Sequence, residues 1–206
     1  MATVTDWADT PAKHPPLLDR LQNGVPVSLQ VFSLLDHKGF ELVDGKAVEK
    51  PMSSFTSWFQ IRLIAALVAA IRSGYYMGPE GGIRCLDGGE RLLKPDFSYF
   101  MRDRLRNGFD ARGSVQVVPD FVVEVLSPED QETATRRNIA WYLEAGVEVV
   151  WVIDPVAHTC EIHGNDGHDR TVSAEEPLVC RFIPGWTATL AEIALDPNTD
   201  SDAGDA

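Results

Sequence analysis

Residues 117–126 read VVPDFVVEVL, and this valine-rich run decides the fold. An apolar run of this length that ends at Ser127-Pro128 predicts a strand buried on both faces of a sheet. Glu124 lies inside the run, where an unpaired carboxylate would cost several kcal/mol. Glu124 therefore needs a partner, which is a cation, a metal ion or a shared proton.

A second acidic residue, Asp96, lies in the short segment 94–100, KPDFSYF. If this segment runs antiparallel to residues 120–126, a register with Asp96 opposite Glu124 puts both carboxylates on one face. Their Cβ atoms would then lie roughly 5 Å apart, close enough to share a hard cation such as Mg²⁺ or Mn²⁺. Asp120 shares that face but lies about 13 Å further along the strand, so we interpret it as a strand-start residue or an indirect support of the site.

The remaining pattern predicts a single domain with a mixed α/β sheet core flanked by helices. Residues 40–43 and 46–49 form a hairpin around Asp44-Gly45. Ser53 or Ser54 caps a helix that runs to about residue 73, and a second helix starts near Ser127-Pro128 and ends at residue 144. We place the domain at residues 26–195, between a flexible arm (1–25) and an acidic, disordered tail (196–206).

Composition narrows the function classes. The net charge of −13 argues against broad affinity for nucleic acid, which depends on Lys and Arg. Three cysteines without a CxxC pair fit a reducing compartment, and the longest apolar block is too short to span a bilayer. We therefore expect a cytoplasmic protein without a membrane partner. The cluster His158, Cys160, His163 and His168 lacks the spacing of a zinc site and is interpreted as part of a surface hairpin.

The chain resembles the Uma-two family of restriction-endonuclease-like proteins, which belongs to the PD-(D/E)xK nuclease superfamily. The resemblance covers most of residues 40–190. The segments that carry it, in order, are ELVDG (41–45), GPEGGI (78–83), KPD (94–96), PDFVVEVLSP (119–128) and YLEAGV with VWVIDP (142–147 and 150–155).

The resemblance implies a restriction-endonuclease-like fold with a site at Asp96 and Glu124. It implies a metal-dependent endonuclease that hydrolyses DNA phosphodiester bonds with Mg²⁺ or Mn²⁺. The metal neutralises phosphate charge and lowers the pKa of an attacking water. The Val125 carbonyl is a candidate third metal ligand, and pairing of double-strand cutters suggests a homodimer.

The chain departs from the family pattern at the lysine that stabilises the developing charge. Leu126 stands where an ExK triplet has its lysine, and Asn138 stands where the family has a lysine on the following helix. Asn138 can position water but brings no positive charge. Lys94 falls opposite residue 126 and is one replacement; a basic residue that only offsets the acidic pair is the other interpretation. Arg137 is a further candidate, turned about 100° away on its helix.

Two alternatives stay open beside the nuclease. A catalytically inactive nuclease fold that serves as a binding or assembly module suits the missing lysine and the acidic surface. A metal-dependent hydrolase of a small phosphate ester suits the charge. The further acids Glu41, Glu49 and Glu80 are candidates for an extra metal ligand, although acids near hairpins and glycine loops are usually solvated.

Overall fold

A computed structural model gives the structure of the protein and describes residues 24, 26–33, 39–50, 52–84, 91–109, 114–128, 130 and 132–195. The expected arm (1–25, except residue 24) and the expected tail (196–206) lie outside the described residues. No helix in the described part is long and apolar enough to cross a membrane.

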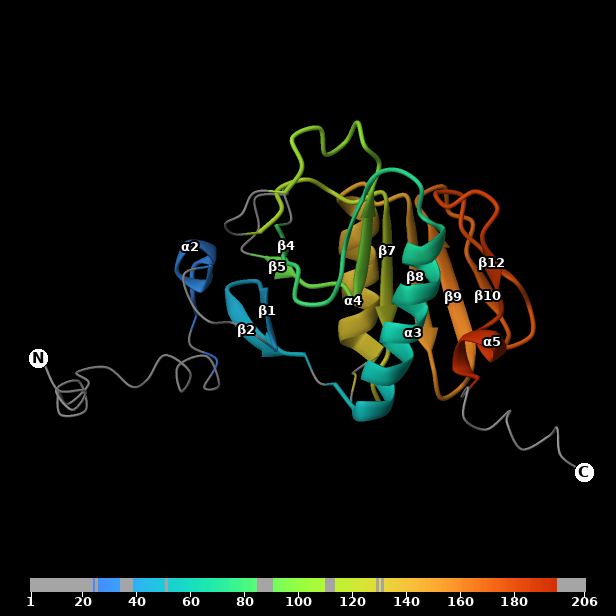
Figure 1. Cartoon of the computed structure of the whole chain (residues 1–206). Coiled ribbons are helices and arrows are strands. Elements are labelled where there is room, and N and C mark those ends of the chain that lie inside the picture. Colours follow the sequence, from blue (N-terminus) through green and yellow to red (C-terminus); the bar gives the residue numbers. More distant parts are fainter. Residues whose placement is uncertain are drawn as a thin grey trace, which may run out of the picture.

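A six-stranded mixed sheet forms the centre of the fold, in the order β10-β9-β8-β7-β6-β3 (Figure 1). Its middle strands are β7 (Phe121–Val125) and β8 (Val149–Asp154), which pair in parallel; all other pairs are antiparallel. Every residue of β7 is buried, as the valine-rich run predicts. The other strands are β3 (Tyr75–Met77), β6 (Phe97–Phe100), β9 (Thr159–Gly164) and β10 (Arg170–Val172).

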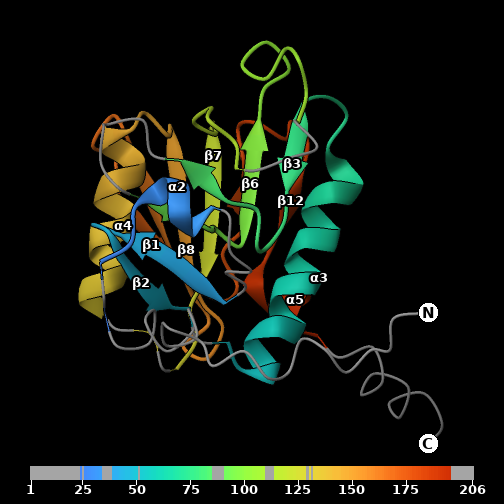
Figure 2. The same ribbon diagram turned by 90° about the vertical axis from the view of Figure 1, so that its left-hand side faces the viewer.

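Helices cover the two faces of this sheet, so that the core has two apolar layers (Figure 2). Helix α3 (Ser54–Ala70) packs on the face of Phe121, Val123 and Val125, together with α5 (Leu190–Ala194) and the β11–β12 pair (Leu178–Val179, Thr187–Ala188). Helix α4 (Glu132–Glu144) packs on the face of Val122. Because strand side chains alternate, Glu124 points to the α4 face.

A second, four-stranded sheet in the order β2-β1-β5-β4 lies on the α4 side of the molecule (Figure 2). Val43 and Leu93 of this sheet join the same apolar cluster as α4. Strands β1 (Phe40–Val43) and β2 (Lys46–Glu49) form the predicted hairpin, with positive φ at Asp44 and Gly45 in its turn. The remaining elements are β4 (Ile83–Arg84), β5 (Leu92–Leu93) and α2 (Leu29–Phe32), which packs on this sheet.

The two long helices begin differently: α3 starts at the predicted serine cap, and α4 starts later than predicted. The side chain of Ser53 accepts a hydrogen bond from the Thr56 N–H, which is the predicted cap of α3. Helix α4 begins at Glu132, four residues later than Pro128 suggested. The side chain of Asp130 accepts from the Ser127 N–H at 2.6 Å, and the Asp130 N–H donates to the Ser127 carbonyl, so these two residues are hydrogen-bonded to each other ahead of the helix.

Candidate active site

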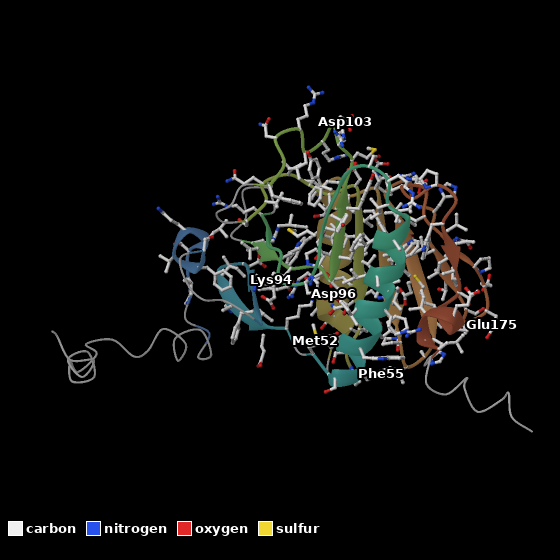
Figure 3. All side chains as sticks on the ribbon, viewed as in Figure 1. Met52, Phe55, Lys94, Asp96, Asp103 and Glu175 are labelled. Carbon is white, nitrogen blue, oxygen red and sulfur yellow. The ribbon has the colours of Figure 1, made fainter. Side chains whose placement is uncertain are left out.

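The predicted register between the two acidic strands is confirmed. Ser98 pairs with Val122 and Phe97 with Val123 in the antiparallel β6–β7 ladder. Continuing this ladder by one pair places Asp96 opposite Glu124. Asp96 and Lys94 lie between the small sheet and the large sheet (Figure 3). The site is therefore built where the two sheets meet.

Each carboxylate has one oxygen fixed by a protein donor. Asp96 Oδ2 accepts from the Val125 N–H at 2.7 Å, and Glu124 Oε1 accepts from the Tyr142 hydroxyl at 2.7 Å. Asp96, Glu124 and Tyr142 are all buried. Donors of this kind orient carboxylates toward a cation. The other oxygen of each carboxylate, Asp96 Oδ1 and Glu124 Oε2, points to one common position.

The ammonium of Lys50 occupies that position. Its Nζ lies 2.8 Å from Asp96 Oδ1, 3.0 Å from Glu124 Oε2 and 2.7 Å from the Lys94 carbonyl oxygen. The sequence analysis identified the need for a partner of Glu124 but did not identify Lys50. The available signal was that the chain holds only five lysines, at positions 13, 38, 46, 50 and 94, and one of them directly follows the hairpin.

Lys50 is held in place from both directions along the chain. Its N–H donates to the Gly39 carbonyl at 2.8 Å, which extends the hairpin by one bond. Three residues later Ser53 caps α3, and the Thr56 hydroxyl donates to the Leu126 carbonyl at the end of β7. These hydrogen bonds hold Lys50 and the start of α3 beside the acidic pair.

In the triad formed by Lys50, Asp96 and Glu124, burial and the oppositely charged partner have opposing effects on the pKa of Lys50 and of Glu124. Burial alone would lower the pKa of Lys50, but the charges of Glu124, Asp96 and Glu41 outweigh it, so the Lys50 pKa is raised well above its usual value. Burial raises the pKa of Glu124 to about 8, with Asp96 and Glu41 adding to the effect while Lys50 and the Tyr142 hydrogen bond oppose it. Lys50 therefore stays charged near neutral pH, and the raised pKa of Glu124 favours its protonated form.

Lys94 does not take the position that its register suggested. Its ammonium lies 2.5 Å from Glu80 Oε2, in the glycine-rich loop. Its backbone serves the site instead, because its carbonyl accepts from Lys50 and its N–H donates to Glu41 Oε1 at 2.7 Å. Glu41 is also only 6% exposed, contrary to the expectation of a solvated acid.

A pocket of about 70 Å³ opens beside the triad and gives water access to it. Asn138 lines this pocket, with its Nδ2 3.5 Å from Glu41 Oε2 and its buried Oδ1 without a hydrogen bond among the described residues. Val125 lines it as well, while its N–H is used by Asp96. The guanidinium of Arg137 lies 4.9 Å from the centre of the Trp141 ring. Asn138 therefore faces the space where the family lysine is expected, while Arg137 lines the same pocket with its guanidinium stacked on Trp141.

Asp120 lies at the opposite end of β7 and does not join the site. Its side chain is fully buried, accepts from the Met101 N–H at 2.7 Å and lies 2.6 Å from Arg104 Nε. Arg104 belongs to the loop 101–107, whose residue Asp103 lies at the far end of the sheet from Asp96 (Figure 3). Lys94 and the loop of Arg104 therefore lie at different ends of the large sheet.

The oxygen set around the Lys50 ammonium fits a hard divalent cation. Two carboxylate oxygens and one backbone carbonyl converge on a positive charge, and Mg²⁺ and Mn²⁺ prefer such ligands. The carbonyl seen there is that of Lys94. Across the described residues, no group of three His, Cys, Asp or Glu side chains is arranged to hold a metal, at the His158–His168 hairpin or elsewhere.

Comparisons with known proteins agree with this architecture. A family model described as "Uma2: Putative restriction endonuclease" matches residues 30–191. A crystal structure described as a "putative nuclease belonging to DUF820" from Anabaena variabilis superposes with a TM-score of 0.70 at 22% identity, covering 82% of this chain and 97% of that chain. At this identity the structural match shows the fold. No curated protein sequence matches.

Proposed function

Because the chain belongs to the Uma2 family, described as putative restriction endonucleases, we propose that it is a metal-dependent nuclease that hydrolyses DNA phosphodiester bonds. Asp96 and Glu124 hold the metal, Mg²⁺ or Mn²⁺, together with a backbone carbonyl. The observation that carries the proposal is the paired geometry of Asp96 and Glu124, each with one oxygen fixed and the other directed to a shared cation position.

The bound metal would polarise the phosphate and lower the pKa of an attacking water. The protein's own groups do the rest. Tyr142 and the Val125 N–H keep the two carboxylates aligned. The Asn138 amide faces the pocket, where it orients water by hydrogen bonding. The Val125 carbonyl stays a candidate ligand, beside the carbonyl of Lys94 that already contacts the cation position.

Nicking of supercoiled plasmid in the presence of Mg²⁺ or Mn²⁺ tests the proposal. The isosteric variants Asp96→Asn and Glu124→Gln are expected to lose both nicking and calorimetric Mn²⁺ binding. Glu175→Gln is a matched control, because Glu175 is exposed on the far side of the molecule (Figure 3). Nicking that survives in Asp96→Asn would show that the activity comes from elsewhere.

One observation favours the second candidate, an inactive binding or assembly module. The Lys50 ammonium already satisfies both carboxylates, so the triad is stable as a purely structural ion cluster. In that role the protein would bind no Mn²⁺ at millimolar concentration, and Asp96→Asn would only lower stability. Calorimetry with Mn²⁺ separates the two functions without any nuclease assay.

A homodimer is part of the proposal. The outward side of α3 exposes Phe55 and Ile61, and Met52 is exposed just ahead of the helix. On a chain with a net charge of −13, a mainly apolar surface is where two copies approach with least repulsion. Sedimentation of the wild type and of Ile61→Lys tests this, since the lysine variant is expected to be monomeric. The two free, buried thiols of Cys160 and Cys180 support the proposed cytoplasmic location.

A further inference from the structure

We propose that the ammonium of Lys50 and a divalent cation compete for the same oxygens of Asp96 and Glu124. The displaced Lys50 then takes the role of the missing lysine, which stabilises the charge that develops on the phosphate. The inference rests on the proposed function and concerns the residue that replaces the missing helix lysine. It goes beyond the family resemblance, which points to the position now held by Asn138.

The distances make the two cations mutually exclusive. Lys50 Nζ lies within 3.0 Å of three oxygens, and a Mg²⁺ ion binds oxygens at about 2.1 Å. A metal bound to Asp96 Oδ1 and Glu124 Oε2 would therefore sit in contact with the ammonium. Repulsion between a divalent and a monovalent cation at that separation removes one of them from the position.

Displacement of Lys50 requires only side-chain motion. Its backbone is tied to Gly39, but its side chain is 22% exposed, whereas the side chain of Asp96 is 2% exposed. A lysine has a flexible four-carbon stem with rotatable donors. Lys50 lines the same pocket as Asn138, so the displaced ammonium stays within the pocket, next to the metal and facing incoming phosphate.

Two other basic residues are less suited to this role. The ammonium of Lys94 is held by Glu80, and its side chain is 2% exposed. The guanidinium of Arg137 is stacked on Trp141. Of these three, Lys50 alone forms ion pairs with both carboxylates; it borders the open pocket, as Arg137 does.

Calorimetric titration with Mn²⁺ tests the competition. Lys50→Met is expected to bind Mn²⁺ at least about tenfold more tightly than the wild type, because the competitor is gone. Lys46→Met is the matched control: Lys46 is exposed on the same hairpin, and its loss should leave the affinity unchanged. Equal or weaker binding by a folded Lys50→Met protein would overturn the competition.

A second measurement uses the wild-type protein and so does not depend on the folding of a variant. Acetylation of Lys50 by acetic anhydride, followed by mass spectrometry, should accelerate several-fold when Mn²⁺ is added, while the rate at Lys46 stays constant. Displacement exposes the Lys50 ammonium to the reagent. An unchanged or slower rate at Lys50 at saturating Mn²⁺ would overturn the proposal.

The catalytic role is tested separately by plasmid nicking. Lys50→Met should lose nicking despite its tighter Mn²⁺ binding, and the double variant Lys50→Met/Asn138→Lys should regain it, because a lysine returns from α4 to the same pocket. Full activity in Lys50→Met, or no recovery in the double variant, would overturn this role. If the wild type does not nick but Mn²⁺ still displaces Lys50, the proposed nuclease function fails while the competition stands.

Discussion

Replacing Tyr142 by phenylalanine removes a single hydroxyl from the support of Glu124. The Tyr142 O–H donates to Glu124 Oε1 at 2.7 Å, and both residues are buried. Phenylalanine keeps the ring and its packing, so no cavity forms. The variant therefore removes the hydrogen bond that aligns the carboxylate and keeps the ring in place.

The size of the effect depends on the charge of Glu124. The pKa of Glu124 is raised to about 8, mainly by burial, so the hydrogen bond is made to a largely neutral group at pH 6 and to a carboxylate at pH 9. A neutral hydrogen bond contributes about 1 kcal/mol and one to a charged group about 2 kcal/mol. Tyr142→Phe should therefore lose about 1 kcal/mol of unfolding free energy at pH 6 and about 2 kcal/mol at pH 9.

Urea unfolding at the two pH values measures this difference. Tyr76→Phe is the control, because Tyr76 is 44% exposed on the edge strand β3 and should change stability little. Calorimetry should also show Mn²⁺ binding about tenfold weaker in Tyr142→Phe, as expected for loss of a group that orients a metal ligand. Equal losses at both pH values, together with unchanged Mn²⁺ affinity, would refute the assigned role of Tyr142.

Three further predictions follow from other groups. Because the raised pKa of Glu124 favours its protonated form, Mn²⁺ affinity should increase as pH rises from 6 toward 8 and then level off; an affinity independent of pH over this range would contradict it. Asp120→Ala should lower the unfolding free energy by about 2 kcal/mol, because the Met101 N–H and Arg104 lose their acceptor, yet leave Mn²⁺ affinity within about twofold. Burial raises the pKa of Cys160 and Cys180, so in a Cys85→Ser background neither thiol should react with Ellman's reagent until the protein is denatured; rapid labelling of the native protein would refute this.

Local patterns in the sequence predicted much of the architecture. The Asp44-Gly45 turn specified the hairpin, and the apolar run 117–126 specified the central strand. Alternation along paired strands was sufficient to bring Asp96 and Glu124 to one face, because register in a buried ladder is fixed by which side chains must be inside.

The identity of the cation partner was not predictable in the same way. Lys50 reaches Asp96 across 46 residues of chain and comes from a different sheet, so no periodicity links the two. In the sequence, Lys50 is a polar residue at the end of an exposed strand, which usually indicates solvent contact. Lys94 was the better candidate by register, but the nearby Glu80 competes for its side chain, and only its carbonyl contacts the Lys50 ammonium.

The location of the acidic pair at the meeting point of two sheets has a mechanical consequence. The β1–β2 hairpin contributes Glu41, and Lys50 directly follows it. The large sheet contributes Glu124 on β7 and Asp96 just ahead of β6. Through its ion pairs with Asp96 and Glu124, the Lys50 ammonium links the hairpin to the large sheet. A divalent ion bound to Asp96, Glu124 and the Lys94 carbonyl would displace Lys50 and take no ligand from the hairpin, so ion loading should speed amide hydrogen exchange along the β1–β2 hairpin.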